Sequence, residues 1–156
     1  MYDEKIKLTV NFKLGEFTKS ATAKALGIDN LGCVDAQVYT NLKALCENVL
    51  QPLRDMVLFP ILVTSGFRCP KLNKAVGGAK NSQHMKGEAA DIKCNYLAAF
   101  QLASIIMLNE VEYDQLILEE RKGRPSWVHI SYVTHRKNRK QALHTTDGKK
   151  YTYLYI

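Results

Sequence analysis

Hydrophobic side chains recur at a helical period over two long stretches of the chain. Between residues 35 and 58 they return every three or four positions, which predicts an amphipathic helix with one side in the core. Asp35 stands where the N-cap of this helix is expected. Pro52 falls inside the pattern, and because proline lacks an N–H group we expect it to kink or split the helix. Residues 96–109 show the same period and predict a second helix.

A shorter helix is predicted near the beginning of the chain. Residues 18–22 form a polar stretch typical of a helix start, and the hydroxyl of Ser20 can cap it. Gly27 stands where this helix should end, because glycine readily adopts the left-handed conformation that closes many helices.

Extended segments follow a different pattern. Residues 6–12 alternate between apolar and polar, with Ile6, Leu8, Val10 and Phe12 on one face, which predicts a strand-like segment. Four further apolar runs predict strands at residues 60–64, 89–94, 113–119 and 127–132. A short polar stretch separates the last two strands, so we expect them to form an antiparallel hairpin.

The order of these elements indicates the fold class. Helices come first, and strands around one crossing helix follow, which predicts an α+β fold. We expect an antiparallel sheet of about four strands with helices packed on one side. Residues 65–82 are rich in Gly, Asn, Ser and Lys and show no period, so we expect a long functional loop there.

Composition bounds the class of protein. The chain has 156 residues, of which 46% are hydrophobic and 24% charged, so we expect one domain over residues 1–156. No apolar run approaches the roughly 20 residues that cross a membrane, and residues 1–12 lack a signal-peptide pattern. We therefore expect no membrane partner and a chain that is cytoplasmic as synthesised. The four cysteines are widely spaced, and we expect free thiols, with Cys46 and Cys94 buried.

The charge balance favours a polyanionic partner. Lys and Arg number 22 against 15 Asp and Glu, which gives a formal net charge of +7. Nucleic acid and an anionic bacterial wall both fit this charge. Residues 136–140 read RKNRK, and tyrosines follow at positions 151, 153 and 155. Aromatic side chains among basic ones are typical of nucleic-acid binding, so this partner stays open as a hypothesis.

Two histidines and one aspartate are candidate metal ligands. His84 lies in the predicted loop, Asp91 lies seven residues later on a predicted strand, and His129 lies on the last strand. Two imidazoles and one carboxylate suit Zn²⁺ and leave a fourth position for water, which is the pattern of a catalytic site. From spacing alone, a single histidine on a strand is more often an ordinary core or surface residue than a metal ligand.

Three separated blocks of sequence surround these residues. Residues 65–92 read SGFRCPKLNKAVGGAKNSQHMKGEAADI, residues 114–119 read DQLILE, and residues 127–131 read WVHIS. Together they resemble the superfamily of zinc D-alanyl-D-alanine carboxypeptidases and murein endopeptidases, which shares its fold with the hedgehog signalling domain. The resemblance covers residues 65–132. It implies zinc ligands at His84, Asp91 and His129, and bacterial peptidoglycan peptide as the substrate.

The resemblance also implies that Arg68 binds substrate, and the positions of Ser82 and Trp127 make them further candidates. Arg68 would grip a substrate carboxylate through two parallel hydrogen bonds; alternatively, it holds its own loop through backbone carbonyls. Ser82 lies two residues before the first ligand and would bond either substrate or the loop backbone. Trp127 lies two residues before His129, on the same side of its strand, and would either line the cleft or join the core.

The general base is less obvious. Many relatives carry an acidic residue three positions before the last ligand, where this chain has Ser126. In the hedgehog-like branch an acidic residue ends the neighbouring strand, which indicates Glu119, and we expect its carboxylate to lack a firm Lys or Arg partner. Strand alternation should turn Glu120 to the other face. Glu88 is the outside candidate.

Taken together, the residues and the resemblance predict a monomeric zinc-dependent peptidase that hydrolyses stem or cross-link bonds of peptidoglycan. It would be either a D-Ala-D-Ala carboxypeptidase or a murein endopeptidase, of the kind that phages and prophages use for lysis, and would reach the wall after release from the cytoplasm. Because Ser126 replaces the usual acid, a non-catalytic zinc-bound binding module of the same fold is the alternative. Nucleic-acid binding comes last, since it leaves residues 65–92 unexplained.

Overall fold

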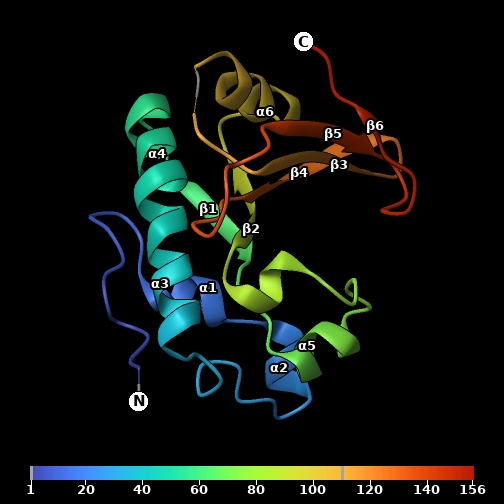
Figure 1. Cartoon of the computed structure of the whole chain (residues 1–156). Helices are drawn as coiled ribbons and strands as arrows, with labels where there is room; N and C mark the ends of the chain where they lie inside the picture. Colours follow the sequence, from blue (N-terminus) through green and yellow to red (C-terminus); the bar gives the residue numbers. More distant parts are fainter. Residues whose placement is uncertain (1, 110) are drawn as a thin grey trace.

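The computed structural model describes residues 2–109 and 111–156. A twisted sheet occupies the middle of the molecule, with a helical rod beside it and short helices at one end (Figure 1). The helical elements are α1 (Leu14–Thr18), α2 (Ala21–Ala25), α3 (Ala36–Leu45), η1 (Cys46–Leu50), α4 (Gln51–Val57), α5 (Pro70–Ala75), η2 (Gln83–Lys86) and α6 (Ala99–Leu108). The strands are β1 (Ile61–Ser65), β2 (Ala89–Cys94), β3 (Gln115–Arg121), β4 (Arg124–Ser131), β5 (Gln141–Thr145) and β6 (Thr152–Tyr153).

The first predicted long helix is present as the rod α3–η1–α4. Asp35 caps it as expected, because its Oδ1 accepts a hydrogen bond of 2.8 Å from the N–H of Val38. The wider π turn of η1 precedes Pro52 and separates α3 from α4. Proline cannot donate the usual helical hydrogen bond, and a π turn is one way to absorb that loss. The predicted interruption at Pro52 is therefore confirmed.

The predicted hairpin is also confirmed, as β3 and β4. Its two-residue turn consists of Lys122 and Gly123, which both have positive φ, at 58° and 71°. This is the left-handed pair that a tight turn between right-twisted strands requires.

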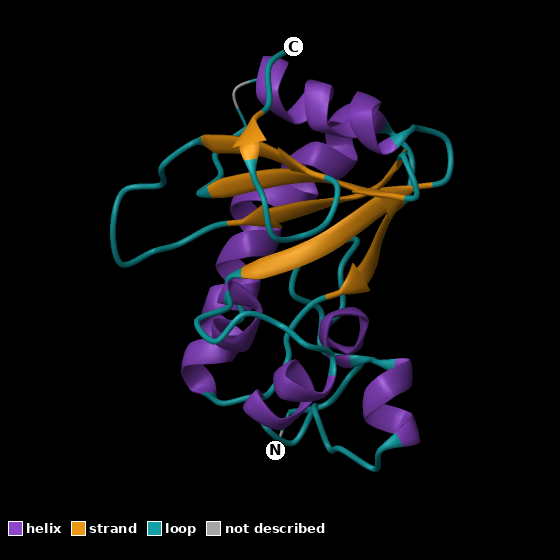
Figure 2. Cartoon of the chain, turned by 90° about the vertical axis from the view of Figure 1, so that its right-hand side faces the viewer, coloured by secondary structure: helices purple, strands orange, loops and turns teal. Residues whose placement is uncertain are grey.

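The sheet differs from the predicted one in size and direction. Its strand order is β1-β2-β4-β3-β5-β6, and β5 runs parallel to β3, so the sheet is mixed and has six strands. The prediction of about four antiparallel strands was wrong because β5 and β6 show no alternation; four of the five residues of β5 are half-buried. Helical segments also lie on both sides of the sheet rather than on one (Figure 2).

Two other segments differ from their predictions. Residues 6–12 form a tight turn instead of a strand, with the N–H of Leu8 donating to the carbonyl of Phe12 at 2.9 Å. Val10 lies at the tip and is 81% exposed, whereas Leu8 and Phe12 are buried, so the prediction that these residues share one face was wrong. The predicted loop at residues 65–82 contains the helix α5, which its Lys-rich sequence did not reveal.

The two faces of the sheet have different chemistry. One face is apolar and packs under α6, and its buried residues include Ile92, Leu116, Val128 and Ile130. The opposite face, here called the site face, follows from the register: Asp91 lies opposite His129, and His129 lies opposite Ile117. Residues two positions along a strand share a face, so Glu119 and Trp127 also belong to the site face (Asp91, Ile117, Glu119, Trp127 and His129).

The predictions for the cysteines and for the short helix near the beginning of the chain are confirmed. All four cysteines are free, and Cys46 and Cys94 are buried. The short helix α2 has Ser20 as its N-cap, and Gly27 follows it with a φ of 61°. No helix in the described part of the chain is both long enough and apolar enough to span a membrane.

Gly87 joins η2 to β2 and packs closely on the helix α3. It has a φ of 70°, and a Cβ atom there would lie 2.7 Å from the carbonyl oxygen of Val38. Gly77 has nearly the same φ, 69°, but a Cβ atom there would meet nothing within 4 Å. Both positions disfavour other residues through their backbone angle, while only Gly87 also lacks space.

We therefore predict that Gly87→Ala destabilises the protein more than Gly77→Ala. Both variants should lose about 1–2 kcal/mol through left-handed strain, and Gly87→Ala should lose about 1–3 kcal/mol more through overpacking. Urea denaturation of the two variants measures the difference. Equal losses would mean that η2 does not pack on α3 in this way.

Candidate functional site

Three side chains from two strands and one short helix converge on the site face. The facing atoms are Nε2 of His84, Oδ1 of Asp91 and Nδ1 of His129, and together they can hold a metal ion. His84 Nε2 lies 3.2 Å from His129 Nδ1 and 3.3 Å from Asp91 Oδ1, and the remaining pair is 3.1 Å apart. The sequence prediction had named these three residues, and the structure brings them together.

The spacing of these atoms matches a metal site. Ligand bonds of about 2.0–2.1 Å in tetrahedral zinc sites place neighbouring ligand atoms roughly 3.3–3.4 Å apart. The three observed distances of 3.1–3.3 Å are close to this separation of neighbouring ligand atoms. Three ligands on one triangular face leave a fourth position on the cleft side, so the donor set fits a divalent ion of catalytic type.

His84 is held in one orientation and one tautomer. Its ring is buried, and Nδ1–H donates a 2.7 Å hydrogen bond to the carbonyl of Gly66, which leaves the lone pair of Nε2 facing the other two ligands. Gly66 cannot carry a side chain, because a Cβ atom would lie 2.5 Å from the backbone of Phe17. The hydroxyl of Ser82 accepts the N–H of His84 at 3.3 Å and caps the turn.

The charge states also suit a metal. Burial lowers the pKa of His84, which keeps its imidazole neutral although Asp91 opposes the shift. Burial alone would raise the pKa of Asp91, but its interactions with His84 and with His129 lower it well below its ordinary range. At neutral pH the site therefore presents one carboxylate and imidazole nitrogens that are able to bind a cation.

The three residues lie in a cleft of about 960 Å³ between the site face and the segment from α5 to η2. The predicted substrate residues Arg68, Ser82 and Trp127 all line this cleft, and so does Glu119. The structure thus brings every sequence-predicted site residue to one place. Ser82 also serves as the helix cap described above, so the predicted bond to the loop backbone is present.

Glu119 has an arginine neighbour that was not expected. Its Oε2 lies 3.1 Å from Nη2 of Arg121, so the prediction that it lacks a firm Arg partner was wrong. Strand alternation explains the pair, since residues two apart share a face. Burial raises the pKa of Glu119, Arg121 lowers it, and the charge of Asp91 adds to the rise, with a net upward direction.

The other two candidate bases, Glu120 and Glu88, have different surroundings. Glu120 follows a bulge and lies 3.2 Å from Nε2 of His144, a residue paired with Leu118 rather than with Glu119. Glu120 therefore faces away from the site, as expected. Glu88 is buried at the cleft, and its Oε1 lies 3.4 Å from Nδ1 of His135.

Arg68 and Trp127 reach the cleft with unused donors. Nη2 of Arg68 lies 3.8 Å from Oδ2 of Asp91, and its buried Nε has no hydrogen-bond partner among the described residues. The indole N–H of Trp127 is likewise without a partner in the described part of the chain. The guanidinium of Arg121 stacks 4.7 Å from the centre of the Trp127 ring.

Sequence reasoning missed several cleft residues from the last third of the chain. Arg121, Arg136, Arg139 and Tyr151 all line the cleft. The basic run at residues 136–140 was visible, but the crossing from β4 to β5 that brings it to the cleft depends on a strand that the sequence does not mark.

The arrangement of the ligand triangle in the cleft indicates a class of protein. Two imidazoles and a carboxylate at the base of a polar cleft are typical of a metal-dependent hydrolase. The family model described as Peptidase M15 matches residues 10–131, which is most of the chain, and the protein belongs to this family of metal-dependent peptidases. A search among curated proteins found no match. The family confirms the resemblance seen over residues 65–132 and indicates a peptide substrate.

We predict that the protein binds about one divalent metal ion per chain. His84→Ala and His129→Ala should each abolish binding, because two remaining ligands hold a metal poorly. His144→Ala removes a histidine from the other face and should bind metal normally. Elemental analysis after dialysis measures the content. Full occupancy in both ligand variants would contradict the assignment.

Proposed function

We propose that this protein is a zinc-dependent peptidase that hydrolyses stem or cross-link peptide bonds of bacterial peptidoglycan. The observation that carries the proposal is the triangle of His84, Asp91 and His129, which lies in a cleft of a chain from the peptidase M15 family. Zinc is proposed because two imidazoles and one carboxylate are its usual catalytic donors. Bound there, zinc would act as a Lewis acid that polarises the scissile carbonyl and lowers the pKa of water.

Glu119 is the proposed general base. It shares the site face with His129, and it lines the same cleft as Asp91 and His129. In this role the carboxylate takes a proton from the attacking water and delivers it to the leaving amine. Its raised pKa favours that exchange, because a stronger base accepts the proton more readily.

Arg68 is the proposed carboxylate clamp. Its guanidinium lines the cleft, and 3.8 Å is a long contact between its Nη2 and Asp91, so its terminal N–H groups remain for a ligand. Stem peptides of the wall end in carboxylates, and a planar guanidinium binds a carboxylate through two parallel hydrogen bonds. Trp127 and Ser82 would line the bound peptide.

The alternative is a zinc-bound binding module without catalysis. Two observations favour it: Ser126 stands where relatives carry an acid, and Arg121 lies against Glu119. The chain belongs to a family of peptidases, and Glu119 lines the cleft that holds the ligand triangle, so we place the alternative second. Within the main proposal, the chain would act as a monomer, would be released from the cytoplasm to reach the wall, and would belong to a phage or prophage.

We predict that Glu119→Gln keeps the fold and the metal but lowers peptide hydrolysis about 10²–10⁴-fold, since general-base catalysis is worth that much. Glu120→Gln changes the adjacent glutamate, which faces the other side, and should stay fully active. The release of amino groups from purified peptidoglycan measures both. Because the pKa of Glu119 is raised, activity should fall on acidification at a pH above the ordinary glutamate value of about 4.3.

Retained activity in Glu119→Gln would end this assignment, and loss in Glu88→Gln would transfer the role to Glu88. If zinc-loaded wild-type protein releases no amino groups although it binds the peptide, the non-catalytic module is correct.

We predict that Arg68→Lys weakens hydrolysis more than folding. Lysine keeps the charge but cannot form two parallel hydrogen bonds, so KM should rise about tenfold or more with little change in the free energy of unfolding. Steady-state kinetics and urea denaturation separate the two effects. A variant that unfolds easily but whose folded fraction has normal kinetics would show that Arg68 only supports its loop.

A further inference from the structure

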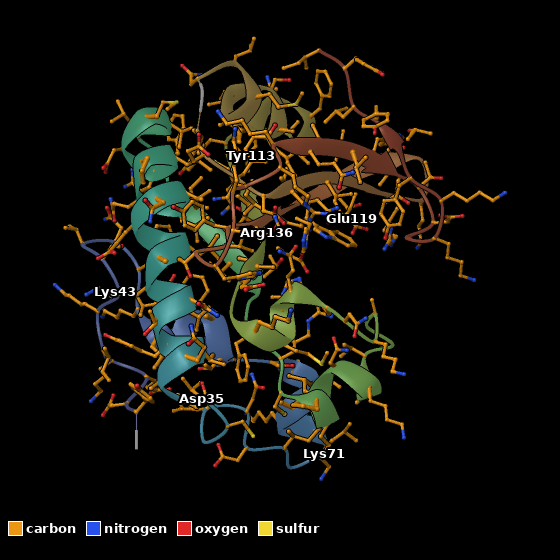
Figure 3. The ribbon with its side chains drawn as sticks, in the orientation of Figure 1. Asp35, Lys43, Lys71, Tyr113, Glu119 and Arg136 are labelled. Carbon is orange, nitrogen blue, oxygen red and sulfur yellow. The ribbon has the colours of Figure 1, made fainter. Side chains whose placement is uncertain are left out.

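A second pair of guanidinium groups borders the cleft, in the loop between β4 and β5. Arg136 and Arg139 both line the cleft, and neither is a predicted ligand or catalytic residue. Figure 3 labels Arg136 on the same side of the sheet as Glu119, toward α5. We propose that this arginine pair (Arg136 and Arg139) binds a second carboxylate of the substrate, in addition to the one assigned to Arg68. The inference rests on the proposed function and specifies its substrate as a peptide with at least two carboxylates.

One fully buried carboxylate fixes both arginines. Asp114 accepts two hydrogen bonds from Arg136, at 2.6 and 2.9 Å. It accepts two from the side chain of Arg139, at 3.0 and 2.6 Å, and a third from its backbone N–H at 3.1 Å. Two positive groups on one negative group leave a net positive charge, which a second anion can neutralise. The arginines are also held in place before any ligand arrives, which lowers the entropic cost of binding.

Both guanidinium groups keep donors for a ligand. Each carries five N–H groups, of which Asp114 accepts two. Nη1 of Arg136 also donates to the carbonyl of Lys137 at 3.0 Å, so Arg136 keeps fewer unpaired donors than Arg139. The side chains are 40% and 47% exposed, so the remaining donors reach solvent at the cleft. Among the described residues, Asp114 is the only carboxylate within ion-pair distance of either arginine. The nearby Glu88 pairs with His135 instead.

The charge of the whole cleft supports an anionic substrate. Three acidic residues line it, namely Glu88, Asp91 and Glu119. Six basic residues line it as well, namely Lys19, Arg68, Lys86, Arg121, Arg136 and Arg139. A divalent metal at the ligand triangle would add further positive charge. Such a cleft attracts an anion from a distance and excludes cationic peptides.

A purely structural role for the arginine pair makes a different prediction. Asp114 also accepts a 3.0 Å hydrogen bond from Gln83, the residue before the ligand His84. The cluster could therefore only anchor the loop after β4 to η2. In that case, losing an arginine would impair every substrate to the same degree, whatever its charge.

The test combines arginine variants with peptides of altered charge. Synthetic stem peptides are prepared with each carboxylate converted in turn to a carboxamide, and kcat/KM is measured for wild type, Arg136→Gln and Arg139→Gln. One of these carboxylates is the one proposed to bind Arg68, and a second is the one proposed to bind the arginine pair. For wild type, conversion of this second carboxylate should lower kcat/KM about ten- to a hundredfold, which corresponds to the free energy of a charged hydrogen bond. In the variants that conversion should have little further effect. Lys137→Gln removes the same charge from a neighbouring exposed residue outside the cleft lining and should behave as wild type.

Equal losses on all peptides would overturn the proposal and leave the arginines as a structural anchor. The proposal would also be overturned if kcat/KM of wild type changed only for the peptide that lacks the carboxylate bound by Arg68. If wild type cleaves none of the peptides, the proposed function fails, and calorimetric binding of the same peptides to the zinc-loaded protein still tests the arginine pair. Discrimination between the carboxylate and carboxamide forms, lost in the variants, would then support the site without catalysis.

Discussion

The close approach of three ligand atoms is the constraint on which the rest of the site depends. His84, Asp91 and His129 bring lone pairs and one negative charge within 3.1–3.3 Å of one another in a partly buried place. Such a cluster is costly to bury unless a cation compensates it. The fold accepts it because the register of β2 and β4 places Asp91 opposite His129, and because the carbonyl of Gly66 fixes the ring of His84.

The surrounding charges follow from that centre. The cleft places Arg68, Arg121 and the arginine pair around three acidic groups, so each carboxylate has a basic or imidazole neighbour while basic charge remains in excess. This excess explains part of the net charge of +7 without nucleic acid. A peptide with several carboxylates would neutralise part of this excess at Arg68 and at the arginine pair.

Much of the site could be predicted from the sequence because its residues lie in strands that the local pattern of apolar and polar residues predicts. The strand at residues 89–94 was predicted with the bounds that β2 has, and the β3–β4 hairpin fixed the face shared by Glu119 and Trp127. The Arg121–Glu119 pair could have been found from the same alternation, since the two residues are two apart on one strand. Strand β5 could not, because an edge region with half-buried side chains carries no clear period, and the cleft position of Arg136 and Arg139 depends on that strand. The turn at Val10 could not be predicted either. Its segment has a clear alternating pattern, but such a pattern fits a tight turn as well as a strand.

The most direct test of the central claim is mass spectrometry of peptidoglycan fragments after incubation with the protein. The account predicts fragments that gain one water at a single type of peptide bond, with the activity lost after chelation and restored by Zn²⁺. Fragments that remain unchanged with fully zinc-loaded protein would contradict it.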